Sequence, residues 1–289
     1  MAKKNIVYLS GGLGNQMFQY AFAKSLQTNY NVKFEINTTF YYRIFKDQTP
    51  REIGLNSFNL KFKDCRDNKL QRIILKIKEK LSNSILSINS TYYSENKVNH
   101  KNFNNLNLKK KNYFRGYWQN FKYFESIKND LKKDFSLDHN LKHLDPNTFK
   151  KITETNSVCV HVRRKDYLGT DLDVVDVNYY RNAFNKLKFK SKSFDLDFFI
   201  FSDDINWCNE NLTFLPNSKF CSFSMLNDFH LMSLCKHFII PNSTFSWWAA
   251  YLSNNNNNKI IIIPTKWHKT NINLLKDASP SNWIILNNK

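Results

Sequence analysis

The residues best suited to chemistry are two adjacent arginines that follow a short apolar run. Residues 158–162 have the composition of a buried strand, and the strand runs into the segment HVRRKDY at 161–167. A guanidinium carries a fixed fork of N–H donors that suits phosphate oxygens. Arg163 and Arg164 therefore predict a site for a phosphorylated ligand, where they could stabilise a leaving diphosphate without a metal ion. The alternative is a solvated arginine–aspartate pair in a loop.

A second apolar run, residues 198–201, ends in the sequence FSDD at 201–204. The paired carboxylates of Asp203 and Asp204 could bind a divalent metal. Serine and aspartate are also favoured at helix N-caps, and the neighbouring sequence offers no histidine or further acidic cluster. We therefore favour helix capping and expect no metal site.

Two further segments could hold an anion at the start of a helix. One is the turn GGLGN at 11–15, which lacks both the third glycine of a dinucleotide fingerprint and the Gly-Lys-Ser/Thr of a P-loop. The other is PNSTFSWW at 241–248, which opens a helix with hydroxyl side chains. Ordinary turn packing or helix capping would explain either segment taken alone.

These segments need a scaffold in which strand ends and helix starts meet. Apolar runs alternate with helical spacing along the chain, which favours parallel sheets whose ligands bind beyond the carboxyl ends of the strands. We expect strands at 5–9, 32–36, 113–117, 157–162, 197–201, 237–240 and 259–263, and helices near 16–27, 122–133, 178–188, 226–235 and 244–252. The fold class predicted is α/β, with two Rossmann-like domains facing a cleft. Their expected bounds are 1–155 and 156–289, and the C-terminal tail could pack back on the first domain.

One predicted helix is strongly amphipathic and basic. Over residues 69–88, helical spacing gathers five aliphatic side chains on one face: Leu70, Ile73, Ile74, Ile77 and Leu81. We expect this face to pack on the core, with contact to anionic lipid or substrate headgroups as the alternative.

Composition bounds the class of protein. The chain has 289 residues, 42% of them hydrophobic, and five cysteines without a C-x-x-C pair, which favours a folded protein with reduced thiols. We find no signal peptide and no apolar run of membrane-spanning length, so a cytoplasmic location is expected. The net charge is +19, and residues 1–150 hold 27 Lys/Arg against 12 Asp/Glu. This surplus indicates an anionic partner, such as nucleic acid, anionic lipid or a phosphorylated substrate, or else simple coding bias.

Taken together, the motifs resemble the α-1,2-fucosyltransferases of glycosyltransferase family 11. The likeness runs from Gly11 to Trp267, is weaker between about 40 and 110, and rests on five segments: GGLGNQMFQYA at 11–21, GYWQNFKYF at 116–124, HVRRKDY at 161–167, FSDD at 201–204 and NSTFSWWAAYL at 242–252. The resemblance implies a GT-B fold with an acceptor-side first domain and a donor-binding second domain. It also implies transfer of L-fucose from GDP-β-L-fucose to the 2-hydroxyl of a terminal β-galactoside in a cell-surface glycan precursor, with inversion. No metal or other cofactor would be needed.

The resemblance also assigns roles to residues. Arg163 and Arg164 would hold the donor diphosphate, His161 would lie near the nucleotide, and Asp228 would contact guanine. The remaining donor contacts would come from Ser243, Thr244 and Ser246, and from Gly14 and Asn15 of the first domain. Lys165 stands where the family often has glycine, which leaves the arginines in place.

The catalytic base is left open between two carboxylates. A base must come within hydrogen-bond reach of the acceptor hydroxyl. Asp166 is close enough in sequence to pair with an arginine and orient it, which makes Asp171 the preferred base. Other interpretations stay open as well: a GDP-fucose-dependent enzyme with a different acceptor or linkage, a basic nucleic-acid-binding protein, and peripheral contact with the anionic inner face of a membrane.

Overall fold

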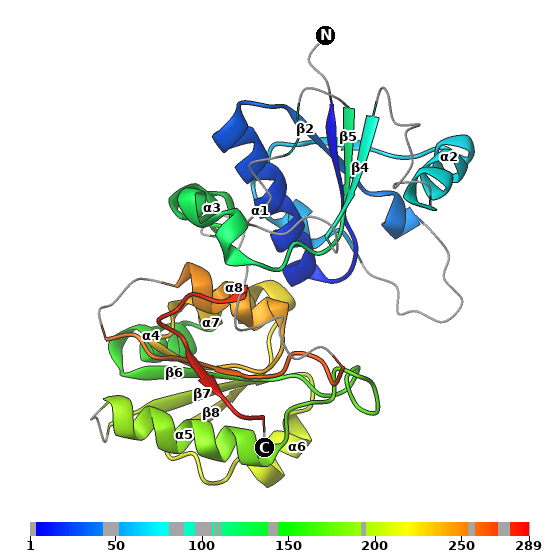
Figure 1. Cartoon of the computed structure of the whole chain (residues 1–289). Helices are drawn as coiled ribbons and strands as arrows, with labels where there is room; N and C mark the ends of the chain where they lie inside the picture. The colour runs from blue at the N-terminus through cyan, green and yellow to red at the C-terminus, as the bar shows by residue number, and fades with distance from the viewer. Residues whose placement is uncertain are drawn as a thin grey trace. The chain divides into compact units, whose positions relative to one another are not determined.

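The computed structural model describes residues 4–42, 52–80, 90–95, 106, 108, 111–137, 144–191, 195–253, 258–270 and 278–288. The chain divides into two compact units, residues 1–136 and 137–289. Each unit is built around its own sheet (Figure 1).

The first unit has a five-stranded sheet in the order β3-β2-β1-β5-β4, with every pair parallel. Helix α1 (Leu13–Tyr30) covers one face, where Phe22 packs against Phe114 of β5. Helix α2 (Lys69–Lys80) lies on the other face, where Leu75 packs with Ile6 and Tyr8 of β1 (Figure 1). The strands are β1 (Asn5–Tyr8), β2 (Phe34–Asn37), β3 (Lys63–Cys65), β4 (Ser90–Ser94) and β5 (Lys111–Arg115).

The turn between β1 and α1 is fixed by buried glutamines. Gly11 has a φ of +78°, and a Cβ there would lie 2.5 Å from the Asn15 side chain, so this position requires glycine. Gln16 donates to the carbonyl oxygens of Gly11 and Glu52 at 3.1 and 2.9 Å. Gln19 accepts from the backbone N–H of Ser10 at 2.9 Å. Much of this motif therefore serves the fold of the turn.

The second unit has a six-stranded, fully parallel sheet in the order β11-β10-β9-β6-β7-β8. Numbered within the unit, this order is 6-5-4-1-2-3, which is that of a Rossmann fold. The strands are β6 (Ser157–Val162), β7 (Asp197–Ser202), β8 (Ser218–Cys221), β9 (His237–Ile239), β10 (Ile261–Pro264) and β11 (Ile284–Leu286).

Helices cover both faces of the second sheet (Figure 1). Helices α5 (Val177–Ser191) and α6 (Ile205–Asn211) pack on the face that presents Val158, Val160 and Val162. The opposite face carries α4 (Pro146–Glu154), α7 (Met225–Leu234) and α8 (Thr244–Leu252). The helix pair α7 and α8 is in mutual contact, and the ring of Phe229 lies 5.4 Å from that of Phe245.

Shorter elements complete the two units. Among the described residues of the first unit, 3-10 turns at Thr39–Tyr42, Gly54–Ser57, Phe121–Tyr123 and Glu125–Ile127 precede α3 (Lys128–Asp134). At the end of the chain, β11 joins the second sheet, and the Asn288 amide donates to the Val174 carbonyl at 2.9 Å. The described C-terminal residues therefore belong to the second unit.

The two parallel sheets with flanking helices confirm the predicted α/β class and its two Rossmann-like parts. Each expected strand is present, within a few residues of its predicted bounds. The helix expected near 122–133 is wrong in extent, because 3-10 turns occupy residues 121–127 before α3 begins. The pattern also missed α4, α6 and four short strands, β3, β4, β8 and β11.

The expectation that the aliphatic face of α2 packs on the core is wrong for its four described members. Leu70, Ile73, Ile74 and Ile77 have exposed fractions between 43% and 65%. Leu75, on the other side of the helix, is the residue that packs on the sheet. Leu81 and the rest of the predicted helix, residues 81–88, lie outside the described residues.

All five cysteines carry free thiols. Across the described ranges, we find no helix that is both long and apolar enough to cross a bilayer.

Replacing Gln19 with leucine should lower the free energy of unfolding by about 2–3 kcal/mol. The substitution removes partners from the Ser10 N–H, the Ser10 hydroxyl and the Gly116 carbonyl. A fully buried unpaired polar group costs about 1–3 kcal/mol, and these three groups together cost less than three such penalties because they are only part-buried and water can reach them. Gln27 lies on the same helix but is exposed, so Gln27→Leu should change stability by less than about 0.5 kcal/mol. Urea unfolding of both variants measures this, and equal stabilities would contradict the structural role of Gln19.

Candidate functional site

The candidate site lies where the strand order of the second sheet reverses. From β6 the chain builds outward through β7 and β8, and then returns to form β9 on the other side of β6. Ligands of doubly wound sheets bind beyond the carboxyl ends of the strands at this reversal. Here the carboxyl end of β6 leads to Arg163 and Arg164, and β9 leads to the start of α8.

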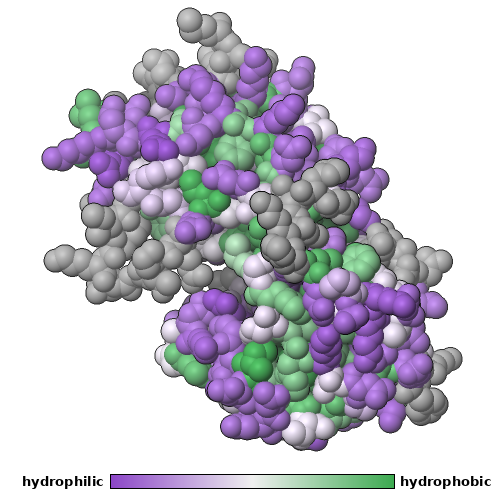
Figure 2. Space-filling model, turned by 180° about the vertical axis from the view of Figure 1, so that it is seen from behind, coloured by the Kyte–Doolittle hydropathy of each residue, from purple (hydrophilic) through white to green (hydrophobic). Residues whose placement is uncertain are grey.

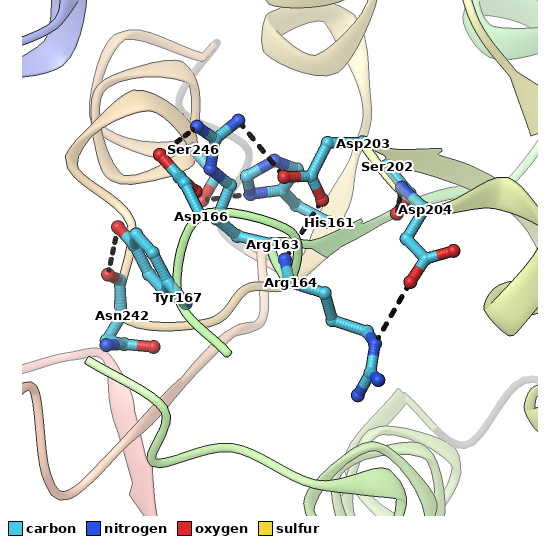
Figure 3. A network of polar contacts seen from close by, with 10 residues as sticks. All are labelled: His161, Arg163, Arg164, Asp166, Tyr167, Ser202, Asp203, Asp204, Asn242 and Ser246. Carbon is cyan, nitrogen blue, oxygen red and sulfur yellow. Dashed lines mark hydrogen bonds and ion pairs between the residues drawn. The ribbon is translucent and has the colours of Figure 1, made fainter. Parts of the chain in front are cut away.

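The register of β6 and β7 sets two arginines beside two aspartates. His161 pairs with Phe201 and Val162 with Ser202, so the residues that follow each strand lie side by side. Arg163 Nη1 lies 3.4 Å from Asp203 Oδ2. The other carboxylate oxygen of Asp203 accepts from the backbone N–H of Arg164 at 2.9 Å (Figure 3).

Arg163 is held by carboxylates at both terminal nitrogens. Besides the Asp203 contact, its Nη2 donates to Asp166 Oδ2 at 2.6 Å. Partial burial alone would lower the pKa of Arg163, but the hydrogen bond to Asp166 and the charges of Asp203 and Asp166 raise it. Arg163 is therefore a fixed cation at the end of β6. The expected pairing of Asp166 with an arginine of the same loop is present.

Arg164 is held differently, by one carboxylate and one ring. Its Nε donates to Asp204 Oδ2 at 3.3 Å, and its guanidinium carbon lies 4.4 Å from the centroid of Trp207. Figure 3 shows the terminal nitrogens of Arg164 directed away from the carboxylates. Within the described part of the chain these nitrogens have no partner, which leaves N–H donors for a ligand.

The acidic pair after β7 serves capping and ion pairing. Asp204 caps α6 by accepting from the backbone N–H of Trp207 at 3.3 Å, as the sequence predicted. The ion pairs with Arg163 and Arg164 were not predicted, because they depend on the strand register. Among the described residues, no group of three His, Cys, Asp or Glu side chains is arranged to hold a metal ion.

His161 is buried beneath the arginines on the face covered by α8. Its Nδ1 lies 2.9 Å from the hydroxyl of Ser246, and its ring lies 6.0 Å from Phe245. Burial and the nearby Arg163 charge lower the pKa of His161 to about 3, so the imidazole is neutral. Ser246 is itself fully buried and lies 3.3 Å from the carbonyl of Ser243. His161 and Ser246 thus join β6 to α8.

Asn242 connects three loops at this edge of the sheet, a role that sequence reasoning missed. Its side-chain amide donates to the carbonyls of Leu172 and Trp267 at 2.9 and 2.8 Å. The backbone carbonyl of Asn242 accepts from the hydroxyl of Tyr167 at 3.2 Å (Figure 3). The loop that carries the arginines is therefore fixed to the segments that follow β9 and β10.

This connection places a histidine beside Asp171. His268 Nε2 lies 3.8 Å from Asp171 Oδ2, and the Lys269 N–H donates to the Asp171 carbonyl at 2.8 Å. Both side chains are accessible, with exposed fractions of 33% for His268 and 59% for Asp171. His268 could not be predicted from the sequence, because it lies nearly 100 residues from Asp171 and in no recognised motif.

The other expected donor residues are distributed over both units. Ser243 is the buried N-cap residue of α8, and Thr244 begins that helix with a half-buried side chain. Asp228 lies in the first turn of α7, where burial raises its pKa to about 6 although it accepts from the Phe223 N–H at 3.2 Å. Gly14 and Asn15 belong to the first unit, at the start of α1. There the side-chain Oδ1 of Asn15 accepts from the side-chain amide of Gln119 at 2.9 Å.

A family profile and two bacterial relatives match this chain along nearly its whole length. Residues 3–287 match the sequence profile of glycosyl transferase family 11. An alpha-1,2-colitosyltransferase of Escherichia coli is 33% identical over 96% of this chain and 97% of its own. The O-antigen biosynthesis glycosyltransferase WbnK of Escherichia coli is 30% identical over 91% and 94%. The mouse galactoside alpha-(1,2)-fucosyltransferase 2 is 28% identical over 48% and 44%.

Among solved structures, the fucosyltransferase NodZ from Bradyrhizobium aligns with 88% of this chain and 94% of its own, at 13% identity and a TM-score of 0.49. The family assignment comes from the sequence matches, which cover both units. On these matches, the chain belongs to glycosyl transferase family 11.

Proposed function

We propose that this family 11 glycosyltransferase moves L-fucose from GDP-β-L-fucose to the 2-hydroxyl of a terminal β-galactoside in a cell-surface glycan precursor. Family membership supports sugar transfer, and the relatives named for α-1,2 transfer support the linkage. The observation that carries the donor proposal is the pair of cations at the end of β6, which suits a diphosphate leaving group. Family membership leaves the nucleic-acid-binding alternative without support.

The mechanism follows from the charge that develops as the sugar leaves. Breaking the bond between the anomeric carbon and the diphosphate concentrates negative charge on the phosphate oxygens. N–H donors that are already oriented stabilise this charge without reorganising during the reaction. Arg163 is oriented by Asp166 and Asp203, and Arg164 by Asp204 and Trp207. We propose that these donors take the role that a metal ion has in other transferases.

Attack by the acceptor hydroxyl from the opposite face would invert the anomeric centre. That hydroxyl must lose its proton, and Asp171 is our preferred base because its carboxylate is accessible. Asp166 is engaged with Arg163 and is better suited to orient it. We propose that Ser243 and Thr244 line the donor site at the start of α8, and that the buried pair His161 and Ser246 supports them from β6 and α8. The donor contacts expected of Gly14 and Asn15 stay a prediction from the sequence.

A second candidate differs only in the sugar that is transferred. The 33% identical relative is named for transfer of colitose, which is the 3-deoxy form of L-fucose. Both sugars would leave the same kind of nucleotide and would need the same arginines. A comparison of the two donors therefore decides between these candidates without affecting the family assignment.

Replacing Arg163 with alanine should lower the rate of sugar transfer roughly 10²- to 10³-fold, since one oriented donor to the leaving group is lost. Arg181 offers a matched control, because it lies on α5 with its guanidinium 4.3 Å from the Phe214 ring and has no part in the site. Arg181→Ala should transfer sugar at close to the normal rate. Near-normal turnover by a folded Arg163→Ala variant would refute the assignment.

Replacing Asp171 with asparagine should reduce turnover by about 10²-fold or more and leave GDP affinity almost unchanged, because a base acts on the acceptor only. Asp166→Asn should weaken GDP binding as well, since its carboxylate orients Arg163. Turnover and GDP titration of both variants separate the roles. Normal turnover by Asp171→Asn would remove it from the mechanism. A loss seen in His268→Gln but not in Asp171→Asn would assign the base to the imidazole.

The pKa of Asp228 predicts how the binding of guanine depends on pH. If its carboxylate accepts from guanine, only the ionised form binds, and protonation becomes appreciable below about pH 6. Guanosine, which has no phosphate to titrate, should bind with constant affinity between about pH 7 and pH 8, below the range in which guanine itself loses a proton. Well below pH 6, its affinity should fall by up to about tenfold per pH unit. Calorimetry should show weak, pH-independent binding for Asp228→Asn. A flat profile in the unsubstituted protein would exclude this contact.

A further inference from the structure

The outer face of α2 exposes a row of aliphatic side chains that no described part of the protein covers. Leu70, Ile73, Ile74 and Ile77 recur at the spacing of one helix face, and at least 43% of each is exposed. Leu75 packs against the first sheet from the opposite side of the helix. The row is therefore a continuous surface directed away from its own unit. We call these four residues the α2 stripe.

The α2 stripe contrasts with the rest of the surface. Figure 2 shows that most of the visible surface is hydrophilic, with hydrophobic residues in smaller areas between. Large exposed side chains elsewhere on helices stand singly, such as Phe189 on α5 and Phe149 on α4. A contiguous row of four aliphatic side chains is the kind of surface that a partner normally covers.

Charge around the α2 stripe indicates what that partner is. Lys69 and Lys76 are exposed along one border of the stripe, and the helical position of Lys78 is on the other border. Residues 1–136 as a whole contain 25 Lys/Arg against 10 Asp/Glu. A second copy of the chain would bring like charges together, whereas an anionic lipid surface accepts both the aliphatic row and the lysines.

We propose that α2 lies in the interface of an anionic membrane, with the α2 stripe at the acyl boundary and Lys69 and Lys76 at the headgroups. Helices that lie in this plane sink their apolar face by about 5–10 Å, and lysines extend along it toward phosphate. The contact anchors the first unit peripherally and brings the enzyme to a membrane surface. It does not depend on which sugar is transferred.

The test is co-sedimentation of the full chain with vesicles of phosphatidylcholine alone or mixed with phosphatidylglycerol. The double variant Ile73→Gln/Ile77→Gln removes half of the α2 stripe and keeps good helix formers. Phe189→Gln is the matched control, because Phe189 is 76% exposed and lies between Lys188 and Lys190 on another helix. Circular dichroism and transfer to a dissolved acceptor should be unchanged in both variants.

We expect the unsubstituted protein and Phe189→Gln to sediment with anionic vesicles and not with phosphatidylcholine alone. The double variant should bind anionic vesicles at least about tenfold more weakly than the unsubstituted protein. Moderate salt should weaken binding in part, since headgroup attraction is screened over about 10 Å at 0.1 M. Equal binding by the double variant would show attraction by charge alone and overturn the proposal. So would failure of the unsubstituted protein to sediment with anionic vesicles. An unsubstituted dimer that the double variant dissociates would make a second copy the occupant.

Discussion

The charge balance around two arginines constrains the rest of the second unit. Arg163 and Arg164 follow the same strand, and their like charges would repel each other if they were left unpaired. Asp166, Asp203 and Asp204 offset them, and each carboxylate also fixes where a guanidinium points. Three carboxylates balance the two guanidiniums and the exposed Lys165 of the same loop. In the proposed donor site, a diphosphate would bind at the N–H donors that the carboxylates leave open, which favours a defined pose over simple attraction.

Three further features of the second unit keep Arg163 and Arg164 paired and in place. The strand register must set Asp203 beside Arg163. His161 lies beneath the arginines and adds no positive charge to them, because burial lowers its pKa and keeps the imidazole neutral. The loop must not move, and Asn242 fixes it to Leu172 and Trp267. These supports lie in segments far apart in sequence, so the positions of the arginines depend on the assembly of β6, β7, β9 and β10.

Sequence reasoning found the elements that carry strong local signals. The two arginines, the cap at Asp204 and the long helices were predictable because each has a local pattern. Strands β3 (Lys63–Cys65) and β8 (Ser218–Cys221) are short strands rich in polar residues at the edges of their sheets, so no apolar run marks them in the sequence. The ion pairs of Asp203 and the approach of His268 to Asp171 arise from pairing between distant segments. The periodicity of α2 predicted an apolar face, but periodicity does not say whether such a face turns to the core or to solvent.

The arginine site is proposed to serve a guanosine diphosphate sugar without a metal ion. The most direct test measures transfer to a terminal β-galactoside from GDP-fucose, its colitose counterpart, GDP-mannose and UDP-galactose, in parallel and with excess EDTA. We expect an α-1,2-linked fucose product that still forms in excess EDTA, with little product from GDP-mannose or UDP-galactose. Preferred transfer of colitose would change the donor sugar and keep the mechanism. Activity with UDP-galactose, or activity lost in EDTA and restored by Mg²⁺ or Mn²⁺, would contradict the account.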